Sequence, residues 1–195
     1  PNMIIRLAES YIKGSLDGGI LPVLKHFPGH GRVNTDSHIE NCVSKIDLNT
    51  LSRTDILPFQ ELHNRFSEYN LPIMTNHITY PDIDEYITTY SRKWLTNLSA
   101  SIFNKSPLFI SDDVEMFSAI SINNINISCE DRLLLALKAG CRLVIATTMQ
   151  NPKIIDDKYS YKYFKEKYLT RNIIEHYEKI HDKMLEITLP ESNNR

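Results

Sequence analysis

The chain has 195 residues, of which 22 are Lys or Arg and 24 are Asp or Glu, so its formal net charge is −2 at pH 7. Hydrophobic residues make up 42%, which is typical of a globular protein, and the charge balance argues against a nucleic-acid binder with a general basic surface. No run approaches the ~18 apolar residues of a membrane helix. The first residues lack a signal-peptide pattern, and three scattered cysteines form no disulfide framework. We therefore expect a cytoplasmic protein without a membrane partner.

Short apolar runs alternate with helical patterns along the chain. A helical pattern over 4–14 precedes the first apolar run, at 20–24, and further apolar runs occupy 71–74, 107–110 and 141–146. Runs of this length without polar alternation are typical of strands that are buried on both faces of a parallel sheet. They predict four buried strands.

The segments between these runs have helical periodicity. Residues 47–69 carry apolar side chains at helical spacing, and Pro58 is expected to divide them into two pieces. Further helical patterns cover 91–103 and 131–139, the latter followed by Gly140 as a helix-ending residue. Strands that alternate with helices predict right-handed βαβ units, and hence an α/β fold with a parallel sheet.

The segment 25–38 is the most informative for function. It follows the first expected strand and holds three histidines, a lysine, an arginine and an aspartate. In parallel α/β proteins, ligands bind beyond the carboxyl ends of the strands. Asp36 and His38 are two positions apart and point the same way in an extended loop, where a carboxylate fixes the tautomer of an imidazole and raises its basicity. We interpret the segment as a catalytic loop rather than a polar surface loop.

A second candidate follows the third expected strand. Asp112 and Asp113 are adjacent, so on a strand they point to opposite sides, and one carboxylate enters a site while the other braces a neighbouring segment. A single aspartate at a strand end is more often structural than catalytic. His77, at the end of the second strand, is open between a structural and a catalytic role.

A zinc site is the competing chemical interpretation. Imidazole and carboxylate ligands for it are available at His26, His30, Asp36, His38 and His77. These histidines lack the i, i+4 spacing of a zinc-binding helix, and a glycine-flanked loop makes a poor rigid cage. The pattern disfavours a metal-dependent hydrolase.

Several segments closely resemble a known family. The first is 25–31, Lys-His-Phe-Pro-Gly-His-Gly, followed by Asp-Ser-His at 36–38. Together they resemble the signature of the glycoside hydrolase family 3 β-N-acetylglucosaminidases, the β-hexosaminidases of peptidoglycan recycling. The resemblance extends over roughly 1–150 and continues through 53–59, 73–81, 110–116 and 139–141.

The resemblance implies a retaining β-N-acetylhexosaminidase that releases terminal N-acetylglucosamine from cell-wall (peptidoglycan) fragments. Asp112 matches the nucleophile that forms a covalent glycosyl-aspartate, and His38 with its partner Asp36 matches the acid/base pair. Lys25 and His26 match the pair that hydrogen-bonds sugar hydroxyls. No metal and no organic cofactor is implied.

The resemblance also implies a (β/α)8 TIM barrel with its site at the C-terminal face. About four βα units, the second half of such a barrel, are expected over 1–150, followed by a C-terminal helical tail over 151–195 that packs on the barrel. The other half has no counterpart in the sequence. We therefore expect a truncated, inactive remnant, a chain that self-associates, or a half-enzyme that needs an N-terminal half-barrel polypeptide as partner.

Overall fold

The computed structural model describes residues 1–34 and 36–147. The helical tail expected over 151–195 lies outside these residues. None of the helices in the described part of the chain is long and apolar enough to cross a membrane.

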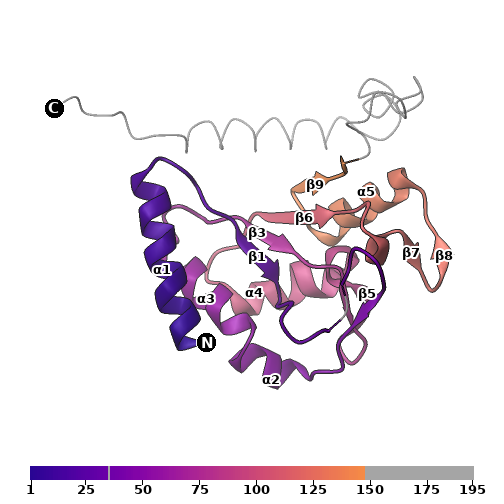
Figure 1. Cartoon of the computed structure of the whole chain (residues 1–195), viewed down its shortest axis with the longest axis horizontal. Helices are drawn as coiled ribbons and strands as arrows, with labels where there is room; N and C mark the ends of the chain where they lie inside the picture. Colours follow the sequence, from indigo (N-terminus) through magenta and orange to yellow (C-terminus); the bar gives the residue numbers. More distant parts are fainter. Residues whose placement is uncertain (35, 148–195) are drawn as a thin grey trace. The chain divides into compact units, whose positions relative to one another are not determined.

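A parallel sheet forms the centre of the fold (Figure 1). Within the described residues it has four strands in the order β1-β3-β6-β9, and each neighbouring pair is parallel. Ile73 is paired with Leu24 on one side and with Phe109 on the other. The strands are β1 (Leu24–Phe27), β3 (Ile73–Thr75), β6 (Phe109–Asp113) and β9 (Leu143–Ile145). The predicted α/β fold with a parallel sheet is thus confirmed.

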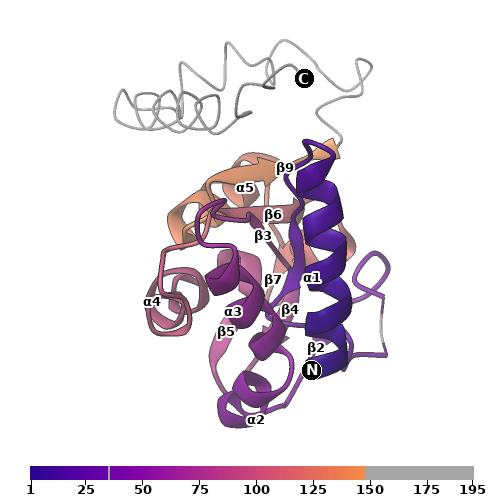
Figure 2. The same ribbon diagram turned by 90° about the vertical axis from the view of Figure 1, so that its left-hand side faces the viewer.

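Helices follow each of the first three strands and cover the sheet (Figures 1 and 2). The chain begins with α1, and α5 starts at a Ser128 cap, whose hydroxyl accepts the Asp131 N–H at 3.1 Å. Gly140 ends α5 with φ +130°, where a side chain would meet Leu95 Cβ at 3.2 Å. The helices are α1 (Asn2–Asp17), α2 (Leu48–Arg53), α3 (Ile56–Arg65), the 3₁₀ turn η1 (Thr88–Tyr90), the π-helix η2 (Lys93–Leu98), α4 (Ser99–Ile102), the 3₁₀ turn η3 (Phe117–Ala119) and α5 (Cys129–Ala139).

Phe27 is the centre of the packing between the sheet and the helices. It is fully buried at the end of β1. Its ring centre lies 5.6 Å from those of Phe59 and Phe109, 6.0 Å from Trp94 and 5.8 Å from Phe103. Aromatic contacts at these distances add to the free energy of burial. They fix the end of β1 against the helical layer.

The bounds of the first strand differ from the sequence prediction. The strand was expected over 20–24 but begins at Leu24, whose N–H donates to the carbonyl of Pro72 at 2.9 Å. Pro22 has no N–H to offer a sheet. Lys25 and His26 are therefore strand residues rather than part of the following loop. The third expected strand, 107–110, likewise extends further than predicted, because β6 ends at Asp113.

The predicted break at Pro58 is wrong. Helix α2 ends at Arg53 and α3 begins at Ile56, so Pro58 lies within the first turn of α3. The N–H groups of a first helical turn have no partner within the helix, and a proline there loses no hydrogen bond. Residues 91–103 are helical as expected, but as a π-helix followed by the short α4.

In the described part of the chain, two small sheets beside the main one were not predicted, because strands this short carry little periodicity. One joins β2 (Cys42–Val43), β4 (Ile78–Tyr80) and β5 (Asp84–Ile87). The other is a hairpin of β7 (Ser121–Ile122) and β8 (Ile125–Asn126). Its turn residues Asn123 and Asn124 have φ of 51° and 63°, and paired asparagines are a sequence signal for such a turn.

Candidate active site

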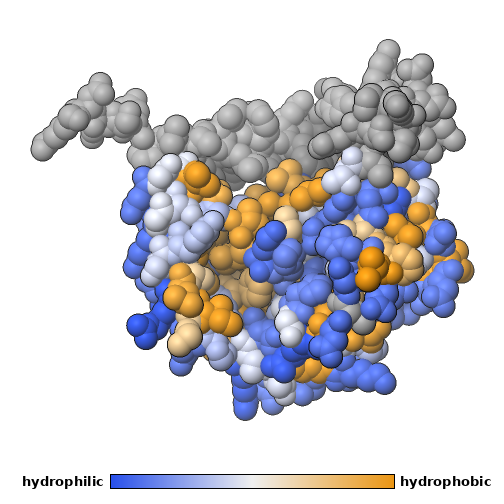
Figure 3. All heavy atoms as spheres, in the orientation of Figure 1, coloured by the Kyte–Doolittle hydropathy of each residue, from blue (hydrophilic) through white to orange (hydrophobic). Residues whose placement is uncertain are grey.

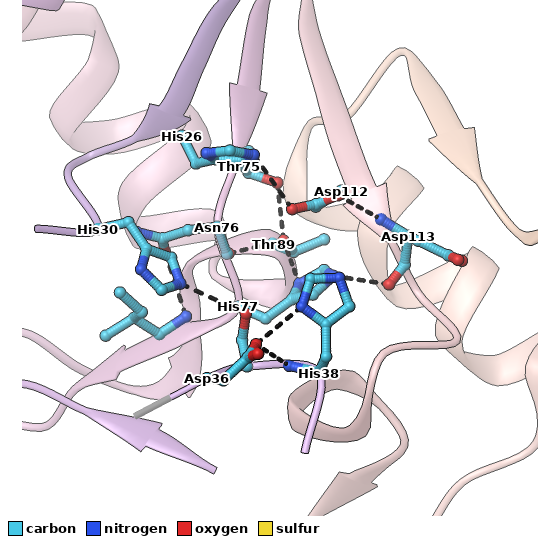
Figure 4. Close-up of polar contacts among 12 residues, drawn as sticks. His26, His30, Asp36, His38, Thr75, Asn76, His77, Thr89, Asp112 and Asp113 are labelled. Carbon is cyan, nitrogen blue, oxygen red and sulfur yellow. Dashed lines mark hydrogen bonds and ion pairs between the residues drawn. The ribbon is translucent and has the colours of Figure 1, made fainter. Parts of the chain in front are cut away.

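Polar residues gather at the carboxyl ends of β1, β3 and β6 (Figure 4). Strand β1 supplies Lys25 and His26, and β6 supplies Asp112 and Asp113. His77 follows β3, the strand that lies between β1 and β6 in the sheet. Because the three strands are parallel neighbours, their carboxyl ends meet at one edge of the sheet.

His26 and Asp112 face each other across this edge. Nε2 of His26 lies 3.5 Å from Oδ2 of Asp112, and the two side chains are 30% and 23% exposed. Burial lowers the pKa of His26, while the negative charge of Asp112 opposes that shift. The charges of Lys25, His30 and His38 lower this pKa further, so these groups lie near enough to His26 to act on its charge. At neutral pH His26 is therefore an uncharged hydrogen-bonding group.

The carboxylate of Asp112 is held from two sides. Its Oδ1 accepts the backbone N–H of Asp113 at 2.9 Å, while Oδ2 faces His26. It is thus a partly exposed carboxylate on a rigid strand, which is the geometry that a nucleophile requires.

Asp113, by contrast, is held by hydrogen bonds through both its side chain and its main chain. Its Oδ1 accepts the N–H of Glu115 at 3.0 Å, and its main-chain carbonyl accepts Nε2–H of His77 at 2.9 Å. The next residues are also fixed, because Arg132 donates to the carbonyl of Val114 at 2.8 Å and pairs with Glu115 at 3.2 Å. The two adjacent aspartates therefore have different surroundings.

Asp36 and His38 form a pair on the loop. Oδ1 of Asp36 accepts the His38 main-chain N–H at 2.9 Å and lies 2.8 Å from its Nδ1. These contacts, the main-chain bond first, lower the pKa of Asp36. The backbone is a turn, not the expected extended loop, because the N–H groups of Ile39 and Glu40 both donate to the Asp36 carbonyl. The two side chains are 58% and 69% exposed, and the contact uses Nδ1 of His38, which leaves Nε2 out of it.

The start of this loop is anchored by residues that the sequence reasoning did not single out. The carbonyl of Gly29 accepts Nδ2–H of Asn76 at 2.9 Å and the hydroxyl of Tyr80 at 2.8 Å. Gly29 has φ +145°, and a Cβ there would lie 2.6 Å from Cβ of Asp55. Asp55 in turn accepts Nε–H of Arg32 at 2.7 Å. Asn76 and Tyr80 lie inside the motif at 73–81, which was the available signal.

The residues proposed as zinc ligands do not form a cluster. Among the described residues, no group of three or more His, Cys, Asp or Glu side chains is placed to hold a metal ion. Instead, His30 lies 3.3 Å from the hydroxyl of Ser37, and His77 is bonded to the main chain.

Comparisons with known proteins give a consistent result. The sequence profile of the glycosyl hydrolase family 3 N-terminal domain matches residues 1–181. A β-hexosaminidase of Idiomarina loihiensis is 34% identical over 145 residues, which are 74% of this chain and 42% of that protein. One of Hydrogenovibrio crunogenus is 31% identical over 145 residues, 74% of this chain and 39% of that protein. The crystal structure of CbsA from Thermotoga neapolitana is 29% identical with a TM-score of 0.67, covering 91% of this chain and 39% of CbsA.

The chain therefore belongs to glycosyl hydrolase family 3, and the resemblance in its motifs is confirmed. The N-terminal domain of this family has a TIM-barrel-like α/β fold, and the parallel sheet with its helices is part of such a barrel. The chain spans about two fifths of the length of the curated relatives it matches.

Proposed function

We propose that this chain carries the catalytic groups of a retaining β-N-acetylhexosaminidase, which releases terminal N-acetylglucosamine from peptidoglycan fragments in the cytoplasm. The observation that carries the proposal is the partly exposed Asp112 carboxylate at the end of β6, opposite His26. The Asp36–His38 pair lies on the loop that follows β1. The β-hexosaminidase names of its relatives support the choice of substrate.

In the first step, a carboxylate oxygen of Asp112 attacks the anomeric carbon as the bond to the leaving oxygen breaks. Nε2–H of His38 gives its proton to that oxygen. Before the transfer the charge of Asp36 stabilises the imidazolium, and afterwards Asp36 keeps the neutral ring in place by accepting its Nδ1–H. In the second step, His38 takes a proton from water, the resulting hydroxide attacks the anomeric carbon, and Asp112 leaves as a carboxylate. Lys25 and His26 bind sugar hydroxyls. No cofactor takes part in these steps.

We further propose that an N-terminal half-barrel with the remaining βα units completes the barrel. In the described residues β3 pairs with one side of β1, and no strand pairs with the other side. Beside this edge, Met3, Leu7 and Tyr11 of α1 are 74%, 67% and 73% exposed, at helical spacing on one face. Monomeric proteins seldom expose such a continuous apolar surface.

A cavity of about 720 Å³ lies at the same edge, between α1, β1 and α3. Its lining is largely apolar and includes Ile4, Val23 and Phe59, with Lys25 and His26 also lining it. Apolar surface is visible on this side of the molecule in Figure 3. A further βα unit, with a strand parallel to β1 and a helix against α1, would cover it. Self-association and an inactive remnant are the alternatives.

The test is hydrolysis of a chromogenic N-acetylglucosaminide by the chain alone and by the chain co-expressed with an N-terminal half-barrel, each with and without a chelator. We expect turnover from the co-expressed halves that the chelator leaves unchanged. Loss of turnover with the chelator would favour a metal-dependent hydrolase. No turnover in any arm would favour an inactive remnant.

A further inference from the structure

A buried chain of hydrogen bonds connects the core to the end of β6 (Figure 4). It runs from Thr75 at the end of β3, through Thr89 in η1, to His77 and the main-chain carbonyl of Asp113. The three side chains are at most 1% exposed. None of them has a part in the proposed catalytic steps.

The direction of each hydrogen bond can be worked back from the Asp113 carbonyl, which is the acceptor at the end of the chain of bonds. The Asp113 carbonyl can only accept, so Nε2 of His77 carries the proton. Burial lowers the pKa of His77 to about 4, so its ring is neutral at pH 7 and Nδ1 is an acceptor. The Thr89 hydroxyl, 2.9 Å away, then donates to Nδ1, and Thr75 donates to Thr89 at 2.7 Å. The main-chain carbonyl of Asn76 also lies 2.9 Å from the Thr89 hydroxyl, and it competes with Nδ1 of His77 for the single hydroxyl proton. The network holds His77 in one tautomer and one orientation.

Asp113 connects this network to Asp112. The Asp113 carbonyl receives the bond from His77, while its N–H donates to Oδ1 of Asp112 at 2.9 Å. The carbonyl and the N–H belong to the two peptide planes that meet at Cα of Asp113, the last residue of β6. Holding the carbonyl plane restricts the backbone torsions of Asp113, and through them the orientation of the plane that carries the N–H. The position of that N–H sets the direction in which Oδ2 of Asp112 points.

We propose that His77 is a positioning residue for Asp112, acting through the backbone of Asp113. The inference rests on the proposed function, because it assumes that Asp112 is the nucleophile. A purely structural alternative is that His77 ties β3 to β6 without affecting the Asp112 carboxylate.

Two substitutions separate these possibilities. In His77→Gln the side-chain amide reaches the place of Nε2, so the bond to Asp113 is kept. In His77→Asn the amide reaches the place of Nδ1, so the contact with Thr89 is kept and the bond to Asp113 is lost. His63→Asn is the matched control, because His63 is equally buried but packs against Phe103 from α3.

The first measurement is amide hydrogen exchange by NMR on the full 195-residue chain. We expect His77→Asn to speed exchange of the Asp113 amide by about tenfold or more, and His77→Gln to stay within about threefold of the unmodified chain. The His63→Asn control should leave that amide unchanged. Equal exchange of the Asp113 amide in both His77 variants would overturn the inference, as would uniformly faster exchange throughout β3 and β6.

The second measurement uses the co-expressed halves. We expect His77→Asn to lower kcat by about 10- to 100-fold, the cost of a small misplacement of a reacting group, with KM little changed and partial recovery in His77→Gln. A fall in kcat that is equal in the Gln, Asn and His63→Asn variants would contradict the inference. Absence of activity in the unmodified halves would count against the proposed function, while the exchange measurement would still decide the role of His77.

Discussion

The hydroxyl of Ser118 lies 2.6 Å from the carbonyl oxygen of Glu40, a residue 78 positions away in the chain. The main-chain N–H of Ser118 donates to the carbonyl of Ser37 at 3.1 Å. The two bonds hold the turn that carries His38 at Ser37 and at Glu40, next to Asp36. Ser118 is buried in η3, just after β6, so one residue ties the proposed acid/base loop to the strand of Asp112.

Removal of the Ser118 hydroxyl should make the loop that carries Asp36 and His38 more mobile. We expect Ser118→Ala to destabilise the chain by about 1 kcal/mol, the usual worth of one hydrogen bond, and to speed amide exchange over 36–41. Urea unfolding and hydrogen exchange measure the two effects. Ser121→Ala, in the neighbouring hairpin, is the control and should leave exchange in the loop unchanged. Unchanged exchange over 36–41 in Ser118→Ala would show that other contacts hold the loop.

Asp112 should be the residue that becomes glycosylated. In the co-expressed halves, Asp112→Asn should abolish trapping of a glycosyl-enzyme by a fluorosugar, because the amide is a poor nucleophile. Mass spectrometry of the labelled peptide is the measurement. Asp113→Asn is the matched control, and we expect it to impair folding more than labelling, since Asp113 bonds to the backbone of Glu115. A label on another carboxylate would refute the assignment.

His38→Ala should show a dependence on the leaving group. Substrates with poor leaving groups need protonation, so we expect their kcat/KM to fall far more than that of activated aryl glycosides. Asp36→Asn should give a weaker form of the same defect, within the range of about 10²- to 10⁴-fold that acid–base catalysis contributes. Equal losses for both substrate types would exclude His38 as the acid.

Acid should destabilise the chain before its carboxylates titrate. Burial lowers the pKa of His26, His63 and His77, the last to about 4, so between pH 6.5 and 4 the unfolded chain binds protons that the folded chain does not. Stability is therefore full above pH 6.5 and falls as the pH drops toward 4. His77 alone accounts for up to about 3 kcal/mol of this loss. Urea unfolding between about pH 7 and pH 5 should show this slope, and His77→Gln should reduce it. An equal slope in both chains would contradict the assignment.

The exposed face of α1 should be the surface that recruits a partner. We expect the chain alone to have negligible activity and to bind a hydrophobic dye, with dye binding lost when the N-terminal half is present. Leu7→Glu should abolish capture of that half, whereas Arg6→Glu, on the same helix, should not. A monodisperse chain that hydrolyses N-acetylglucosaminides without a partner, at about 1–10³ per second, would refute this proposal.

Much of the architecture could be predicted from local patterns. The apolar runs predicted the four parallel strands of the main sheet in the described residues, because a strand that is buried on both faces has no polar alternation. The start of β1 after Pro22 and the place of Pro58 inside α3 were not predicted, because the effect of a proline depends on whether its backbone position has a hydrogen bond to lose. The short strands of the two small sheets could not be predicted, because two to four residues carry too little periodicity.

The sequence by itself determined which chemical groups are available and in what order, including the Asp36–His38 pair, whose members lie close together in the chain. Tertiary structure decided which distant groups meet. Only the strand order β1-β3-β6 brings His26 to 3.5 Å from Asp112, places His77 against Asp113, and sets Ser118 beneath the loop. These contacts depend on sheet register and on close packing around Phe27, which arise from the whole fold and leave no mark on the local sequence pattern.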